Sequence, residues 1–176
     1  MNYLLETDRL MLREPTINDA AFMLRLVNEP TWLQYIGDRK VYSVEDAKQY
    51  LLNGSIKSFN ENGFGFSVVE IKETGEKIGM SGLVKRDYLD DIDIGFAYFP
   101  EYTGFGFALE AARATLDHAH TSLGFNRVVA ITTPDNVRSI RLLEKLGLVF
   151  EKTIVVNDEN LNIYSIDFKE RESVRA

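Results

Sequence analysis

Two glycines, Gly104 and Gly106, stand at the start of a predicted helix in the stretch PEYTGFGFALEA (residues 100–111). A glycine has no Cβ, so a ligand can approach its backbone closely. The N–H groups at a helix start also attract anions, through hydrogen bonds and through the helix dipole. The pair therefore indicates a site for a phosphate or diphosphate, and a plain tight turn between a strand and a helix explains the same residues equally well.

Two common phosphate-binding motifs do not fit this loop. A P-loop requires the pattern GxxxxGK[ST], and no Lys-Ser or Lys-Thr follows these glycines. A dinucleotide fingerprint requires a third small residue where this chain has Leu109, and it also requires an early β-α-β unit. What remains is a nest of backbone N–H groups between the end of a strand and a helix N-terminus.

The loop needs a strand before it and a helix after it, and the sequence predicts both. Apolar and alternating runs predict strands over residues 7–13, 64–71, 77–85, 91–99, 127–132, 148–156 and 161–168. Capping residues and helical periodicity predict helices over residues 16–29, 43–63, 104–122 and 136–147.

The order of these elements predicts one α+β (mixed α/β) domain over residues 1–170, followed by a short tail at 171–176. We expect a mixed, mostly antiparallel central sheet flanked by helices. Strand 91–99, helix 104–122 and strand 127–132 should form a right-handed β-α-β unit, which places the glycine loop at one end of two parallel strands.

Composition excludes several classes of function. The chain has 176 residues, and its 45% hydrophobic and 27% charged residues are ordinary for a soluble protein. It has no apolar run long enough to span a membrane and no signal-peptide pattern at its start, so we expect a cytoplasmic protein that does not bind membranes. The net charge of −7 disfavours nucleic acid as a partner and is compatible with a cationic acceptor such as an amine.

Metal and thiol chemistry are not expected. The sequence contains no cysteine, which removes thiolate metal sites and a cysteine nucleophile. Its two histidines, His118 and His120, are two residues apart on a predicted helix, so they do not share a face as metal ligands would. We therefore predict no metal site and interpret both histidines as structural.

The glycine loop belongs to an ordered pair of segments. TGFGFALEA is followed about 28 residues later by NVRSIRLLEKLGLVFE, and this pair resembles the signature of the GCN5-related N-acetyltransferases (GNAT family). The loop is similar to the [RQ]xxGx[GA] segment of that family, with Gly106 and Ala108 in the small positions and Thr103 where Arg or Gln is usual. The opening ETDRLMLREPTINDA resembles the RimJ/RimL branch, which acetylates the N-termini of ribosomal proteins. The resemblance covers nearly the whole chain.

This resemblance implies a GNAT-like fold and the transfer of an acetyl group from acetyl-CoA to a primary amine, by direct attack in a ternary complex. The end of strand 91–99 would bind the pantetheine, and a backbone N–H near Tyr98 would polarise the thioester carbonyl. The N–H groups of the loop would bind the pyrophosphate. The implied cofactor-binding residues are Tyr98, Phe99, Gly104, Phe105, Gly106, Phe107, Ala108, Asn136, Arg138, Ser139 and Arg141.

The chain departs from the family pattern in two places. Thr103 and Phe105 replace residues that are often basic, so cations on the next helix (Arg138, Arg141 and Lys145) are candidates to bind the phosphates, with a solvated helix face as the alternative. A tyrosine that often protonates the leaving thiolate is replaced by Leu143. The nearest hydroxyl is that of Ser139, which either binds or protonates the sulfur or donates back to a helix carbonyl.

A general base is needed because an alkyl ammonium is protonated at neutral pH and cannot attack. Asp93 on strand 91–99 lies close to where the family often has an acidic base, and the alternative is a solvent-facing strand aspartate. Asp158 and Glu159, before the last strand, are the other candidates. We therefore take Asp93, Ser139 and the backbone at Tyr98 as the candidate catalytic groups.

The acceptor side is expected to include Trp32, Tyr35 and Asp158, with Ile36 beside them, although scattered aromatic residues are more often core. The acceptor itself is a protein or peptide N-terminus, or a small amine such as a polyamine, amino acid or amino sugar. A domain that binds acetyl-CoA without turnover is the alternative from another class. The sequence is compatible with a monomer or a dimer.

Overall fold

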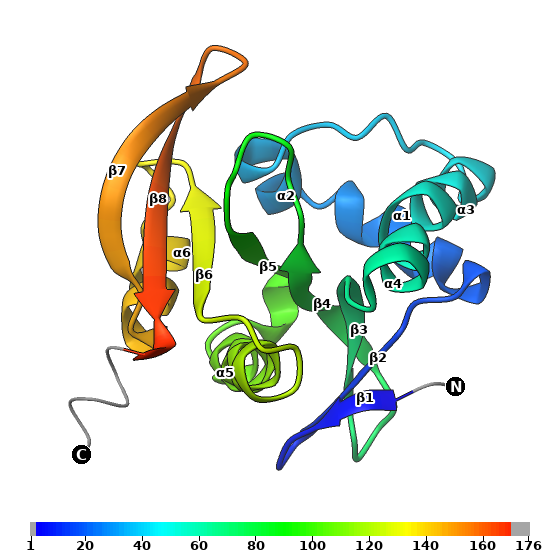
Figure 1. Cartoon of the computed structure of the whole chain (residues 1–176). Helices are drawn as coiled ribbons and strands as arrows, with labels where there is room; N and C mark the ends of the chain where they lie inside the picture. The colour runs from blue at the N-terminus through cyan, green and yellow to red at the C-terminus, as the bar shows by residue number, and fades with distance from the viewer. Residues whose placement is uncertain (1–2, 170–176) are drawn as a thin grey trace.

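Eight strands form one sheet in the order β1-β2-β3-β4-β5-β6-β8-β7 in the computed structural model, which describes residues 3–169 (Figure 1). Neighbouring strands are antiparallel except β5 and β6, which are parallel. The expected mixed, mostly antiparallel sheet is thus confirmed, and the tail predicted at 171–176 lies outside the described residues. The strands are β1 (Tyr3–Glu6), β2 (Leu10–Arg13), β3 (Phe66–Ile71), β4 (Lys77–Val84), β5 (Ile92–Tyr98), β6 (Arg127–Thr132), β7 (Val149–Val156) and β8 (Glu159–Asp167).

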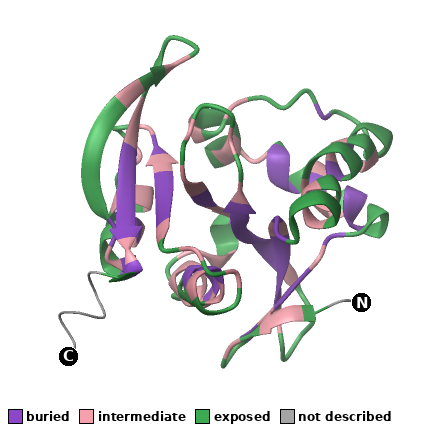
Figure 2. Cartoon of the chain, in the orientation of Figure 1, coloured by how far each residue is buried: buried purple, intermediate pink, exposed green. Residues whose placement is uncertain are grey.

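Helices cover both faces of the sheet. On one face α1 and α3 bury apolar residues against Met80 and Phe99, and on the other face α5 and α6 pack against Ile94 and Val128. Figure 2 shows the central strands largely buried between these layers, whereas the edge strand β7 is exposed. The helices are α1 (Ala20–Val27), α2 (Pro30–Tyr35), α3 (Val44–Leu51), α4 (Lys57–Asn62), α5 (Phe107–Thr121) and α6 (Val137–Leu146), with short turns η1 (Ile17–Asp19), η2 (Leu52–Ile56, a π-helical turn) and η3 (Pro100–Tyr102).

Three segments differ from the sequence-based expectation. Of the strand predicted over 7–13 only residues 10–13 are strand (β2), and residues 7–9 form the turn of a hairpin with β1, which was not predicted. The segment after α1 was expected to be a connection but forms α2, because Pro30 occupies the first helical position, where its fixed φ fits and its missing N–H costs no hydrogen bond. The helix expected over 43–63 widens into η2 around Gly54, which divides it into α3 and α4.

The parallel strands β5 and β6 separate soon after they begin. Their register contains two residue pairs, Ile92 with Val128 and Asp93 with Val129. Beyond these pairs β5 stays with β4 as far as Tyr98, and β6 stays with β8. The facing edges of β5 and β6 are therefore left open over most of their length.

Strand alternation decides which backbone groups line this opening. The N–H of Phe99 donates to the carbonyl of Ile78 at 3.0 Å, on the β4 side of the strand. Successive N–H groups of a strand point to opposite edges, so the N–H groups of Phe96 and Tyr98 point toward β6. The edge that faces the opening thus presents donors without strand partners.

Candidate active site

A cleft of about 850 Å³ lies beside the end of β5 and continues along the glycine loop. The start of α5 and one side of α6 form its far wall, and α2 closes it from the other side. The structure brings most of the predicted cofactor and acceptor residues together here. Those that line the cleft are Trp32, Tyr35, Tyr98, Gly104, Gly106, Phe107, Ala108, Asn136, Arg138, Ser139 and Arg141.

The glycine loop adopts a backbone conformation that side chains disfavour. Gly104 has a φ of +89° and Gly106, the N-cap of α5, has a φ of +82°. A Cβ at Gly104 would meet open space, so the requirement there is conformational rather than steric. The first N–H groups of α5 have no intrahelical acceptors, and Phe107 and Ala108 lie against the cleft. These features suit a bound anion such as a diphosphate.

A residue that the motif analysis missed supports this loop from outside the cleft. The guanidinium of Arg9 donates from Nη1 to the carbonyl of Phe105 at 3.0 Å and from Nε to the carboxylate of Glu110 at 2.7 Å. It also lies 4.5 Å from the centre of the Phe107 ring. The hydroxyl of Thr7 donates to the same carboxylate at 2.6 Å. The β1–β2 turn thus fixes both the loop and the first turn of α5.

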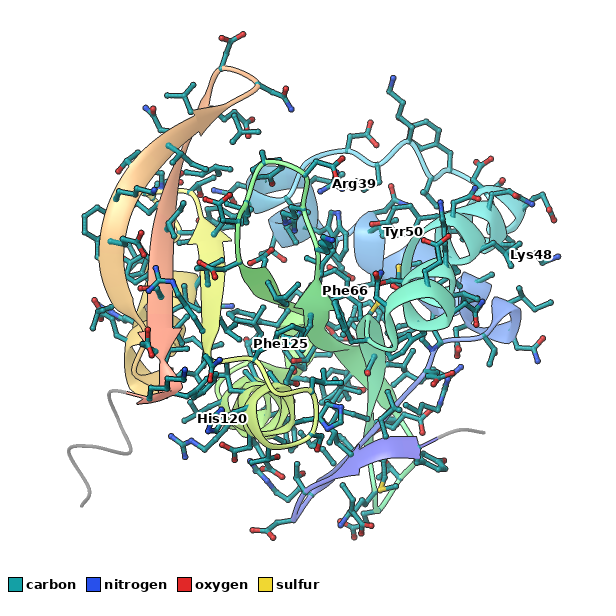
Figure 3. The ribbon with its side chains drawn as sticks, viewed as in Figure 1. Arg39, Lys48, Tyr50, Phe66, His120 and Phe125 are labelled. Atoms are coloured by element: carbon teal, nitrogen blue, oxygen red, sulfur yellow. The ribbon has the colours of Figure 1, made fainter. Side chains whose placement is uncertain are left out.

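A second, smaller cavity of about 120 Å³ adjoins the cleft on the side of α1 and α3. Two charged residues line it, Asp93 and Arg86, and Arg86 Nε donates to Asp93 Oδ2 at 2.6 Å. Aliphatic, aromatic and thioether side chains form most of the remaining wall. Figure 3 labels two of them, Tyr50 from α3 and Phe66 from β3, between the helical layer and the sheet.

Asp93 is buried, with 1% of its surface exposed, so the solvent-facing alternative is wrong. Burial raises the pKa of its carboxyl to about 6, and the charge of Arg86 opposes that rise. The backbone N–H of Ile131 also favours the ionised form. No group in the described part of the chain makes a hydrogen bond of standard geometry to Oδ1, which leaves this oxygen available to a ligand.

The cleft and the smaller cavity meet at a shared wall that includes Trp32, Phe96 and Ser139. The N–H of Ser139 donates to the Asn136 side chain, which caps α6. Within the described residues, its hydroxyl makes no hydrogen bond, so the expected alternative of bonding back to a helix carbonyl is not seen. Leu143, one turn further on, is buried and lines the smaller cavity without a polar group.

The arrangement places a glycine loop, a row of strand N–H donors and a buried carboxylate around two adjoining cavities. A family model described as an acetyltransferase (GNAT) domain matches residues 9–149, which is more than half of the chain. The chain belongs to the GNAT acetyltransferase family. The acyltransferase activity predicted from the sequence is confirmed at this level, since relatives with the same domain are named N-acetyltransferases.

Similar proteins extend over the whole GNAT domain. The chain is 33% identical to YkkB, an uncharacterized protein of Bacillus subtilis (strain 168), over 91% of this chain and 93% of that one. It is 30% identical to the uncharacterized N-acetyltransferase YoaA of the same organism, over 93% and 96%. The spermidine N(1)-acetyltransferase of Escherichia coli (strain K12) is 31% identical over 44% of this chain and 42% of that one.

The solved structure of RimL, a ribosomal L7/L12 alpha-N-protein acetyltransferase in complex with coenzyme A, matches with a TM-score of 0.81. It covers 94% of this chain and 98% of that one at 16% sequence identity. At this identity the match shows the shared fold alone.

Some predicted residues of the GNAT site lie elsewhere. Phe99 is buried in the core, where its ring packs edge-on against Phe22, and it does not line the cleft. The hydroxyl of Tyr98 is also buried, near Ser81, and burial raises its pKa, so this hydroxyl does not reach the cleft. Asp158, at the tip of the β7–β8 hairpin, lines neither cavity.

Phe105 contributes its backbone rather than its side chain. Its exposed ring stacks on Phe107 instead of lining the cleft.

Arg86 is a second site residue that the sequence motifs did not indicate. The register of the β4–β5 hairpin explains its position: Asp93 pairs with Val84, so a side chain two residues beyond Val84 can fold back over the carboxylate of Asp93.

In residues 3–169 no group of three or more His, Cys, Asp or Glu side chains is arranged to hold a metal ion. No helix in that range is long and apolar enough to cross a membrane.

Proposed function

We propose that this GNAT domain transfers an acetyl group from acetyl-CoA to a primary amine held beside Asp93. One observation carries the proposal: the glycine loop lines the cleft, a buried carboxylate with an unpartnered oxygen lines the smaller cavity, and the two cavities share Trp32, Phe96 and Ser139. Acetyl-CoA supplies the activated acetyl thioester when it is bound.

The chain has groups for each part of this donor. The N–H groups at the start of α5 bind the pyrophosphate, and Arg138 and Arg141, which line the same cleft, add positive charge. The N–H groups of Phe96 and Tyr98 face the opening, where they bind pantetheine and polarise the thioester carbonyl. Because these are backbone groups, the site does not depend on the side chains at Thr103 and Phe105.

Asp93 acts as the general base. The amine nitrogen attacks the acetyl carbon, a C–N bond forms and the C–S bond breaks, and the proton of the amine moves to Asp93 Oδ1. A pKa of about 6 keeps this carboxyl mostly ionised at neutral pH while it remains a usable base. Ser139, at the junction of the two cavities, is the candidate to bind or protonate the leaving sulfur.

Calorimetric titration with acetyl-CoA, followed by assay of CoA release with a panel of amines, tests the proposal. We expect micromolar binding and CoA release that depends on the amine. Binding without amine-dependent release would favour a sensor domain, the alternative supported by Leu143 in the place of an acid. An absence of binding would contradict the proposed function itself.

The RimJ/RimL branch, with a protein or peptide N-terminus as acceptor, remains part of the proposal. The opening segment ETDRLMLREPTINDA supports it. The partial match to a spermidine acetyltransferase supports a small amine instead. The charge and polarity of the smaller cavity distinguish a peptide N-terminus from a polyamine, as described below.

Replacing Arg9 by alanine should raise the KM for acetyl-CoA by about 10-fold with little change in kcat, because the loop loses the hydrogen bond that holds the Phe105 carbonyl. Steady-state kinetics with acetyl-CoA and with S-acetylpantetheine, which lacks the pyrophosphate, measure the effect. The pantetheine substrate should be unaffected.

Arg127→Ala is the control, since Arg127 also pairs with carboxylates, those of Asp91 and Glu151, and lines neither cavity. An equal rise of KM for both donors in Arg9→Ala would show that Arg9 does not act through the pyrophosphate loop.

A further inference from the structure

The wall of the smaller cavity is mostly apolar and carries almost no net charge. Its charged residues, Asp93 and Arg86, are joined by the 2.6 Å hydrogen bond and largely compensate each other. Burial raises the pKa of Tyr50, so its phenol stays neutral. The wall is completed by apolar side chains, among them Met23 and Met80.

This charge balance disfavours a polycation. A polyamine can place one amine at Asp93, but its other ammonium groups would lie against apolar walls or near the guanidinium of Arg86. Burying an ammonium without a counter-ion is costly, and a nearby like charge adds to the cost. The cavity therefore fits an acceptor with a single basic nitrogen.

Two buried polar groups of the cavity residues lack partners in the described chain. Asp93 Oδ1 is an acceptor, and Trp32 Nε1 is a donor on a ring that lines both cavities. A buried polar group without a partner costs free energy that a ligand can recover. The amine of an acceptor satisfies Asp93, and a hydrogen-bond acceptor on the same molecule, such as a carbonyl oxygen, satisfies Trp32. A protonated polyamine has no hydrogen-bond acceptor that could satisfy Trp32.

The volume sets the size of the remaining group. The cavity measures about 120 Å³, and an apolar cavity of roughly 150 Å³ is able to bind benzene. A branched aliphatic or a small aromatic group therefore fills most of the available space. Each methylene that leaves water for such a wall adds to transition-state binding.

From these features we infer that the acceptor is a primary monoamine carrying one apolar group and a nearby hydrogen-bond acceptor. The inference rests on the proposed acetyl transfer. Two sources share this chemistry: a free amino-acid derivative and the first residue of a peptide. The apolar group occupies the smaller cavity, and the amine lies between Asp93 and the acetyl group.

Initial rates with acetyl-CoA and matched acceptors test the inference. We expect kcat/KM for leucine amide to exceed that for glycine amide by about 10-fold or more, and to exceed that for spermidine by a similar factor. A leucine-initiated tripeptide amide distinguishes the sources: a higher kcat/KM than leucine amide points to a peptide, and an equal or lower value to a free amine. Equal rates for glycine and leucine amides, or a preference for spermidine, would overturn the inference.

Two variants test the cavity directly. Ser55→Phe should fill it, because Ser55 from η2 lines it, and should lower the leucine-to-glycine amide ratio about 10-fold. The neighbouring Asn53→Phe, exposed on the same turn and outside the cavity, should leave the ratio unchanged. Trp32→Phe removes the indole N–H. It should therefore lower kcat/KM for leucine amide more than kcat/KM for 3-methylbutylamine, which has no carbonyl.

Acetyl-CoA titration of the unaltered protein and of each variant distinguishes a failure of the inferred acceptor from a failure of the proposed acetyl transfer. If acetyl-CoA binds and amines are acetylated without an apolar preference, the inference fails and the proposed function stands. If acetyl-CoA binds but none of these acceptors is acetylated, the inference also fails. If acetyl-CoA does not bind the unaltered protein, the proposed function fails and the inference fails with it.

Discussion

Asp93→Asn is expected to lower kcat/KM by about 100-fold or more at neutral pH, in the range that general-base catalysis contributes. Asparagine keeps the shape of the side chain but cannot accept the proton of the attacking amine. Because Asp93 is buried and hydrogen-bonded to Arg86, the substitution also leaves that guanidinium without its carboxylate. Thermal unfolding of the variant should therefore accompany the kinetics, so that a loss of activity is not confused with a loss of fold.

The pH profile gives a sharper test of the same role. Burial raises the pKa of Asp93 to about 6, so the carboxyl is protonated below that pH and ionised above it. The value of kcat/KM should therefore rise with pH through about 6, and this limb should disappear in Asp93→Asn. The acceptor amine adds its own feature near pH 8 if it is an α-amino group, and the variant should leave that feature in place.

Asp91→Asn is the matched control. It makes the same change two residues earlier, at a carboxylate that pairs with Arg127 and lines neither cavity. The control should keep both the rate and the limb near pH 6. A limb that survives in Asp93→Asn would show that another group is the base.

Gly106→Val is the second substitution with a large expected effect, a weakening of acetyl-CoA binding by about 10- to 100-fold. The φ of +82° strains a β-branched residue, and its Cβ would lie 3.4 Å from Arg9 Nη2, beside the anchor of the loop. Losing one hydrogen bond from the loop to a charged phosphate, at about 1.5–3 kcal/mol, accounts for this range. Calorimetric titration measures the change directly.

A second glycine controls for the backbone strain. Gly124 has a φ of +74°, a Cβ there would meet no atom within 4 Å, and the residue follows the end of α5, away from the cleft. Gly124→Val should reduce stability by about 1–2 kcal/mol, as a left-handed residue does, and should leave acetyl-CoA affinity unchanged. Equal affinity losses in the two variants would argue against a phosphate-binding loop.

The local part of the candidate site could be predicted from the sequence. Glycine before a helix N-terminus constrains φ and exposes N–H groups whatever surrounds it, so Gly104 and Gly106 indicated the loop directly. The order of strands and helices and their approximate bounds followed from periodicity within each segment. Parallel pairing of β5 with β6 followed from the helix between them.

The remaining features depend on contacts between segments far apart in the chain. Arg13 alternates like an exposed strand residue, yet it is 2% exposed and pairs with Asp19 and Glu70 on two other elements. Arg9 reaches a loop about a hundred residues away, and the turn that carries it was expected to be strand.

The burial of Asp93, within the site itself, also depends on distant parts of the chain. Strand alternation places it opposite Ile94 but does not reveal whether that face is covered, and it is the packing of α1 and α3 and the side chain of Arg86 that bury it. Periodicity reports which residues of one element share a face. Only the tertiary structure decides what covers that face, because burial and the pKa shifts that follow from it arise from the neighbouring elements.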